Sequence, residues 1–320
     1  MSESAPKIGL LLPTRGLIIG DQSRNANLII QLATIAESEG LDSVWVGDSL
    51  TAKPRLEPLL TLASLVPVTH RIKLGTAILI ASLRAPVALA QSTATLDLLS
   101  KGRLILGVGA GGGFNQAQKQ EWVTAGISPK GRGKRLEETI QIVTGLLSQD
   151  SLDFKGTHYQ FTNVGIGLAS FRITGVPILF ACHLGAKRPE QFDRAARLGN
   201  GFITISEDPH GFAQICSHVK TAAHIHNKNF AAMEKVMYMT INLNDDLEIA
   251  REEADQFLKA YYGINMWSQL WGPWGPSKLT IQRIQEFSES GASTIIIRFA
   301  SFDVEKQLAK FLKEIWPYFS

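Results

Sequence analysis

Short apolar runs alternate with longer amphipathic segments along most of the chain. The runs are rich in Val, Ile, Leu and Phe, and most are apolar on both faces, as parallel strands covered by helices must be. We therefore predict strands in eight places: residues 7–13, 43–48, 73–80, 103–109, 176–182, 201–205, 234–242 and 293–300.

The segments between these strands repeat apolar residues every three or four positions, which predicts helices that pack by one face. Gly40 follows the first helix as a C-terminal cap, and Pro86 lies in the first turn of the second. The predicted helices span residues 25–39, 85–99, 134–148, 189–198, 212–226, 247–261, 280–290 and 304–316. Strands that alternate with helices over 320 residues predict an α/β fold, a (β/α)8 barrel, as one domain over residues 1–320.

Two segments exceed the length that this repeat requires. Residues 150–175 contain the alternating stretch DFKGTHYQF, which predicts a small hairpin outside the barrel. Residues 263–276, GINMWSQLWGPWGP, hold three tryptophans between glycines and prolines. This second insert is either a lid over a ligand, or an aromatic plug or subunit contact, and the sequence leaves both readings open.

Composition and charge narrow the class of protein. With 45% apolar and 19% charged residues and a net charge of +3, the chain is globular and is not expected to bind nucleic acid. The chain has one local basic group, made of Lys130, Arg132, Lys134 and Arg135. We interpret it as a solvated loop before a helix, in preference to a phosphate contact. Two cysteines, no apolar signal region and no long apolar run predict a cytoplasmic protein without a membrane segment.

A glycine-rich stretch, RLILGVGAGGG at residues 103–113, follows the fourth predicted strand. Gly107, Gly109 and Gly112 have the spacing of a dinucleotide-binding turn. Such a turn requires a helix that opens directly on the glycines, whereas here the helical pattern resumes only near Lys134. We therefore expect a glycine loop of another kind.

In a (β/α)8 barrel, chemistry belongs to the C-terminal ends of the strands. Asp48 and His183 end the second and fifth strands, and Arg298 lies on the apolar last strand. An unpaired buried charge is costly, so Arg298 must reach a ligand anion at the barrel mouth or meet an acidic partner, and we expect the mouth. Gly185 precedes a helix start, which suits a phosphate, and Lys187 would add charge.

Other chemistries find little support. His218, His224 and His226 share a helix at spacings that do not converge on a metal, so no metal site is expected. The chain has neither a G-x-S-x-G elbow nor a G-K-[ST] phosphate loop. Cys182 and Cys216 are expected to be structural.

A long ordered set of motifs nevertheless points to one family. The runs AESEGLDSVWVGDSL, LEPLLTLASLVPVTHRIKLGTAILI, LRAPVALAQSTATLDLLSKGRLILGVGAGGG and RGKRLEETIQIV resemble the bacterial luciferase-like flavin-dependent oxidoreductases. The resemblance is close over residues 7–148 and looser through VPILFACHLGAKRPEQFDRAARLGNGFI and PWGPSKLTIQRIQEFSESGASTIIIRF. It implies a TIM barrel, a homodimer, and FMN or a deazaflavin bound at the strand C-termini.

The resemblance also implies which residues surround the flavin. The positions expected to line it are Pro13, Ala77, Ile78, Gly109, Ala110, Gly111, Gly112, Leu184, Gly185, Ala186 and Lys187. The family's G-P-K turn reads Gly185, Ala186, Lys187 here. Relatives carry a non-prolyl cis peptide at the third strand, and the matching bond joins Ala77 to Ile78, with Ile78 expected to back the ring.

One departure from the family affects the chemistry. Many relatives have Asp-His after the second strand, whereas this chain has Asp48 and Ser49, so no histidine acid/base is assigned there. Asp48 either orients the substrate or a water, or caps the following loop. His183 is the best remaining imidazole, with a purely structural role as the alternative. Asp48, His183 and Arg298 are thus the candidate catalytic residues.

We therefore expect a monooxygenase that uses reduced FMN and dioxygen on a small organic substrate. A separate flavin reductase would supply the reduced flavin, because no nicotinamide module is visible. Two alternatives remain open: hydride transfer by the deazaflavin coenzyme, and a non-catalytic flavin-binding protein. The substrate is not predicted, because its pocket walls come from the inserts and the strand-end loops.

Overall fold

The computed structural model describes residues 5–20, 25–205, 207–264 and 271–320. In these residues, parallel strands close into a barrel in the order β1-β2-β3-β4-β7-β8-β9-β11 and back to β1. The strands are β1 (Lys7–Leu11), β2 (Ser43–Val46), β3 (Lys73–Leu79), β4 (Leu104–Val108), β7 (Ile178–Ala181), β8 (Gly201–Thr204), β9 (Glu234–Leu243) and β11 (Thr294–Phe299). Each lies within a predicted strand or within one residue of it, and the predicted (β/α)8 barrel is confirmed.

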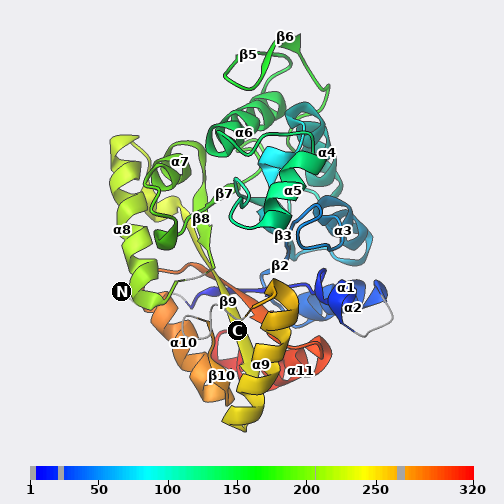
Figure 1. Ribbon diagram of the computed structural model, residues 1–320, viewed down its shortest axis with the longest axis vertical. Helices are drawn as coiled ribbons and strands as arrows, with labels where there is room; N and C mark the ends of the chain where they lie inside the picture. The colour runs from blue at the N-terminus through cyan, green and yellow to red at the C-terminus, as the bar shows by residue number, and fades with distance from the viewer. Residues whose placement is uncertain (1–4, 21–24, 206, 265–270) are drawn as a thin grey trace.

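Helices surround the barrel (Figure 1). Those that match a predicted helix are α2 (Asn27–Ser38), α4 (Pro86–Leu99), α6 (Arg132–Ser148), α7 (Glu190–Leu198), α8 (Pro209–Ile225), α9 (Leu247–Tyr262), α10 (Ser277–Glu289) and α11 (Val304–Glu314). Gly40 follows α2 with a φ of 85°, as expected of a glycine cap. Short 3₁₀ turns are η1 (Val66–Val68), η2 (Ala81–Leu83), η3 (Leu184–Ala186), η4 (Phe230–Ala232) and η5 (Trp316–Tyr318).

Three helices lie where the pattern predicts none: α1 (Gly16–Ile19), α3 (Pro58–Leu65) and α5 (Gln116–Thr124). The expectation that helical structure resumes only near Lys134 is therefore wrong. The segment of α5 is polar and has no apolar stripe, so periodicity does not reveal it. It begins instead at a capping box, in which the side chains of Asn115 and Gln118 each accept a backbone N–H of the other residue.

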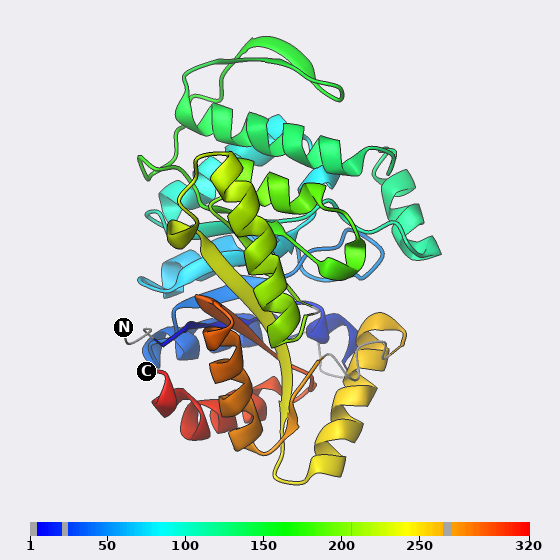
Figure 2. The ribbon, with the colours of Figure 1, turned by 90° about the vertical axis from the view of Figure 1, so that its left-hand side faces the viewer.

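The two inserts have different structures. Strands β5 (Leu152–Lys155) and β6 (Gln160–Val164) pair antiparallel, so the predicted hairpin is confirmed, and Figure 2 shows it standing outside the barrel. Glu138 of α6 fixes its turn by accepting the N–H groups of Thr157 and His158 at 2.7 and 2.8 Å. The second insert ends in β10 (Trp274–Gly275), which pairs with β9. Residues 265–270 of that insert, with Trp267, lie outside the described residues.

The core has two shells because strand side chains alternate between the faces of the closed sheet. The outer shell packs strands against helices. The inner shell fills the barrel with Leu11, Trp45, Ala77, Leu179, Ile203, Val236, Tyr238 and Ile296. Trp45 occupies the room left by Gly9 and Gly75, where any Cβ would collide with its indole. Among the described residues, no helix has the length and apolar character to cross a membrane.

Candidate active site

One half of the barrel mouth carries small residues. Gly47, Gly107 and Ala181 lie two residues beyond Trp45, Ile105 and Leu179, toward the C-terminal ends of the strands, and Gly109 lies two residues further along. Together with Ala77 they form what we call the small-residue floor, at the ends of β2, β3, β4 and β7. Ile78 and Ala181 pack with the inner shell and yet stay partly exposed. The inner shell is therefore not fully covered at these two positions.

The peptide bond between Ala77 and Ile78 is cis, as predicted. The register between β3 and β4 shifts at this point, between Thr76 and Leu79. The Ile78 side chain reaches across to the glycine loop, because a Cβ on Gly109 would lie 2.7 Å from Ile78 Cδ1. Ile78 and Gly109, two of the predicted cofactor residues, are thus brought together.

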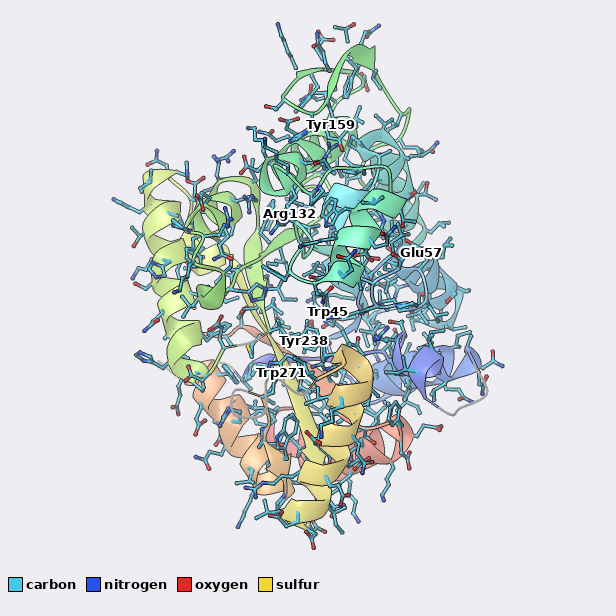
Figure 3. The ribbon with its side chains drawn as sticks, viewed as in Figure 1. Trp45, Glu57, Arg132, Tyr159, Tyr238 and Trp271 are labelled. Carbon is cyan, nitrogen blue, oxygen red and sulfur yellow. The ribbon has the colours of Figure 1, made fainter. Side chains whose placement is uncertain are left out.

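The rest of the glycine loop is held from behind by α5 and α6. Trp122 Nε1 donates to the carbonyl of Gly112 at 2.7 Å, and Arg132 Nε donates to the carbonyl of Gly111 at 3.1 Å. Gly111 has a φ of 74°, which favours glycine. Ala110 packs against the outer shell instead of facing the barrel. The expectation of a solvated loop before a helix is therefore wrong for Arg132, Lys134 and Arg135, which lie within α6, where Figure 3 labels Arg132.

The loop after β7 offers fewer backbone donors than the sequence indicates. The Leu184 N–H donates to Glu207 Oε1 at 3.0 Å, and the Lys187 N–H donates to the Leu184 carbonyl at the same distance. The Ala186 N–H donates to the His183 carbonyl. Gly185 and the Lys187 side chain are exposed, and the space around Gly185 is open. A phosphate in this loop would therefore rely on these two residues.

His183 lies at the rim between β7 and β8. Gln191 brackets its backbone, accepting from the His183 N–H at 2.8 Å and donating to its carbonyl at 2.6 Å. The ring places Nδ1 3.4 Å from Thr204 Oγ1. Burial lowers the pKa of His183 to about 4, so the imidazole is neutral at pH 7.

Asp48 has both carboxylate oxygens engaged. Arg84 donates to Oδ2 at 2.5 Å and to Oδ1 at 3.1 Å, and the Ile80 N–H donates to Oδ2 at 2.8 Å. The Asp48 side chain is only 3% exposed. These contacts fix the segment that follows the cis bond, so they support a positioning role for Asp48 over direct contact with a substrate.

Ser49 stands where many relatives carry histidine, and it builds a loop. Its hydroxyl donates to Glu121 Oε1 at 2.7 Å and accepts from the Lys53 N–H at 2.8 Å. The same Glu121 oxygen accepts the Thr51 N–H at 2.8 Å. Burial would raise the pKa of Glu121, but these donors outweigh it and hold the pKa below its usual value. A buried carboxylate on α5 thus shapes the loop that carries Lys53 and Arg55.

Arg298 is 3% exposed and projects from β11 into a cage of aromatic rings. Its Nε donates to Thr240 Oγ1 at 3.0 Å and its Nη1 to the Tyr262 hydroxyl at 2.6 Å. The guanidinium carbon lies 5.1 Å from the Tyr238 ring centroid and 4.5 Å from that of Trp271, two residues that Figure 3 labels near β9. In the part of the chain that the structure describes, Arg298 has no acidic partner.

Arg298 belongs to a larger basic group at the mouth. We call it the mouth cluster: Arg15, Lys53, Arg55 and Arg298, gathered around Tyr261 and Tyr262. Pro13, a predicted cofactor residue, lines a small cavity with Tyr261 and Arg298 and so lies on this side. The positions of Lys53 and Arg55 after β2 could have suggested them, but no local signal places the tyrosines of α9 beside them.

The comparisons agree with this architecture. A model of the luciferase-like monooxygenase family matches residues 7–298, and the chain belongs to that family. The F420-dependent glucose-6-phosphate dehydrogenase of Amycolatopsis mediterranei (strain U-32) is 26% identical over 321 residues, which cover 90% of this chain and 93% of that protein.

Two solved structures share the fold. Monooxygenase RslO1 from Streptomyces bottropensis superposes with a TM-score of 0.83 at 21% identity, over 98% of this chain and 100% of that one. An F420-dependent secondary alcohol dehydrogenase superposes with a TM-score of 0.79 at 20% identity, over 99% of both chains.

Proposed function

We propose that this oxidoreductase transfers a hydride between a deazaflavin coenzyme, F420, and a small organic substrate. The observation that carries the proposal is the near full-length similarity to an F420-dependent dehydrogenase, on a chain whose barrel mouth has the small-residue floor. The FMN-dependent monooxygenase expected from the sequence has no such support from that relative. It remains the competing hypothesis, because RslO1 shares the fold.

The residues present fit a flat ring that carries a phosphate-bearing chain. Gly47, Ala77 and Gly109 carry no bulky side chain of their own. The side-chain ends of Arg55 and Ile78 lie over the two glycines and would have to shift to admit a ring. Exposed Gly185 and Lys187 are suited to a phosphate. When bound, the coenzyme accepts or donates a hydride, which is a two-electron step without dioxygen.

We assign proton transfer to His183. Oxidation of a substrate alcohol releases a hydride from carbon and a proton from the hydroxyl group. Because Nδ1 of His183 faces Thr204 and the ring is neutral at pH 7, Nε2 is available to accept that proton.

Coenzyme selectivity tests the proposal. The purified protein is titrated with F420 and with FMN, and binding is followed by fluorescence. We expect F420 to bind at least about tenfold more tightly than FMN. Anaerobic incubation with secondary alcohols and sugar phosphates should then reduce bound F420.

Two results would contradict the proposal. The first is preferential FMN binding with oxygen uptake when reduced FMN is supplied, which would establish the monooxygenase. The second is tight F420 binding without turnover on any substrate class, which would favour a non-catalytic binding protein.

A further inference from the structure

Four cations surround one pair of tyrosines at the barrel mouth. The guanidinium carbons of Arg15, Arg55 and Arg298 lie 5.2, 5.6 and 5.2 Å from the Tyr261 ring centroid. The Tyr262 centroid, 4.7 Å from that of Tyr261, lies 4.3 Å from Lys53 Nζ. Residues at or after the ends of three strands therefore bring positive charge to the two tyrosines of α9.

Among the described residues, the mouth cluster lacks the direct ion pairs found elsewhere in the protein, and Glu121 acts on Lys53 only as a more distant charge. The partly buried Arg84 and Arg172 each pair with an aspartate, whereas no member of the mouth cluster forms an ion pair among the described residues. Arg298 Nη2 is buried and has no hydrogen-bond acceptor. Aromatic faces offset part of the cost of burying a cation, but they cannot accept the in-plane N–H groups of a guanidinium. The arrangement is thus incomplete within the described residues.

The four cations also act on one another. Burial is the largest of the effects that lower the pKa of Lys53 to about 8, and the charges of Arg55, Arg15 and Arg298 lower it further. The same three arginines lower the pKa of Tyr261 against the opposing effect of burial. A negative group placed here would relieve this repulsion.

The position of the mouth cluster separates it from the expected coenzyme phosphate. Arg15, Arg55 and Arg298 follow or occupy β1, β2 and β11, which are neighbours in the barrel, whereas Gly185 and Lys187 follow β7 across the mouth. Arg55 Nη1 lies directly over Gly47, beside the carbonyl of Ala77. The cluster therefore borders the small-residue floor on the side away from the η3 loop.

We propose that the mouth cluster binds an anionic oxygen group of the substrate, a phosphate or a carboxylate, so that the substrate is a small organic anion. The inference rests on the proposed function for the identity of the neighbouring coenzyme, but anion binding itself requires no coenzyme. Arg298 Nη2 and Arg55 supply directed N–H donors, and Lys53 and Arg15 supply charge.

Anion binding to the protein without coenzyme tests the proposal. Thermal unfolding and calorimetry are recorded with sodium phosphate and, separately, with sodium acetate, at constant ionic strength set with sodium chloride. We expect at least one of these anions to raise the Tm, and their relative affinities to identify the preferred group. Arg55→Met and Lys53→Met should each weaken binding about tenfold or more.

Three variants serve as controls. Arg251→Met removes an exposed arginine of α9 and should bind the anion as the wild type does. Arg55→Lys keeps the charge and should retain part of the affinity. This result would show that weak binding by Arg55→Met comes from the lost charge and not from a folding defect. Lys187→Met should leave the affinity unchanged if the anion lies in the mouth cluster.

The proposal is overturned if neither anion binds more tightly than chloride, or if binding depends on Lys187 and not on Arg55. It is also overturned if Tyr261 is ionised at neutral pH, seen as a tyrosinate absorption that Tyr261→Phe removes, because the counterion would then be internal. F420 binding that persists in any of these cases would leave the proposed function intact. Failure of F420 binding beside intact anion binding would contradict only the proposed function.

Discussion

Ser49 donates a hydrogen bond to Glu121 Oε1 at 2.7 Å, which joins the loop after β2 to α5. Two backbone N–H groups of the same loop also donate to that oxygen, at 2.8 and 3.1 Å. Glu121→Gln places an amide donor among these donors, so we expect a loss of about 1–3 kcal/mol in the free energy of unfolding. Urea unfolding measures it.

The same change should loosen the loop that holds Lys53 and Arg55. We therefore expect phosphate affinity to fall along with stability in Glu121→Gln. Ser49→Ala, which removes one donor and leaves the carboxylate, should cost only about 1 kcal/mol. Equal losses in the two variants would show that Glu121 does not organise the loop.

The pair Asp48–Arg84 allows a test of positioning against catalysis. Asp48→Asn leaves Arg84 without its bidentate partner, and we expect the free energy of unfolding to fall by about 2–4 kcal/mol. Adding Arg84→Met should recover part of that loss, and a double-mutant cycle measures the coupling. If Asp48→Asn keeps full stability but abolishes turnover, Asp48 acts on the substrate instead.

The lowered pKa of Lys53 predicts that the stability of the protein depends on pH. Its pKa in the folded protein, about 8, lies below the ordinary value of 10.5, so between these values the unfolded chain binds more protons than the folded one. Stability conferred by this group therefore rises as pH increases from 8 to 10.5. Relative to Lys53→Met, the wild type should gain roughly 1–2 kcal/mol across that window, after allowance for solvent screening.

Denaturant unfolding of both proteins at several pH values measures this difference. Titrations of groups remote from Lys53 are common to the two proteins and cancel in the comparison. A difference that stays constant over the window would show that the Lys53 ammonium is not destabilised in the folded protein. Anion affinity should fall over the same window, as Lys53 loses its proton.

His183→Asn tests the assignment of the proton acceptor. If Nε2 accepts the substrate proton, kcat should fall by about 10²-fold or more while F420 affinity changes little. In the wild type, the imidazole should stay neutral in NMR spectra until the pH approaches 4. A kcat within a few-fold of the wild type would leave His183 a structural role at the rim of β7 and β8.

Gly109→Val tests the small-residue floor. The added side chain would meet Ile78 Cδ1, which lies 2.7 Å from an ideal Cβ at this position, and should project into the space expected for the ring. We expect F420 affinity to fall about tenfold or more. The neighbouring Gly113→Ala is the matched control, because its Cβ would lie 3.7 Å or more from surrounding atoms. Equal affinity in the two variants would place the ring elsewhere.

The barrel could be predicted from the sequence because its signals are local. Continuous apolar runs and one-sided stripes depend only on neighbouring residues, and the strands and matching helices lie close to where these patterns end. Helix α5 was not predicted, because its polar segment is fixed by a capping box and by the tertiary contacts of Glu121 and Trp122.

The candidate site was only partly predictable, because many of its contacts join residues that are far apart in the sequence. The resemblance located Ala77, Ile78 and Gly109, whose arrangement follows from backbone shape. The engagement of Asp48 by Arg84 depends on contacts between distant side chains, and so does the gathering of Lys53 and Arg55 around Tyr261. A single sequence contains no record of such pairings.

The uneven distribution of large and small side chains around the barrel affects how the substrate preference of such a protein can evolve. A (β/α)8 barrel offers eight equivalent strand ends, and here both the size and the charge of the side chains differ between the two halves of the mouth. Glycine and alanine occupy the mouth from β2 to β7, while arginine and large aromatic side chains crowd the half formed by β9, β11 and β1. If the coenzyme lies over the opposite half, as proposed, substitutions in the crowded half can change substrate preference without altering the choice of coenzyme, so the two properties can evolve separately on one scaffold.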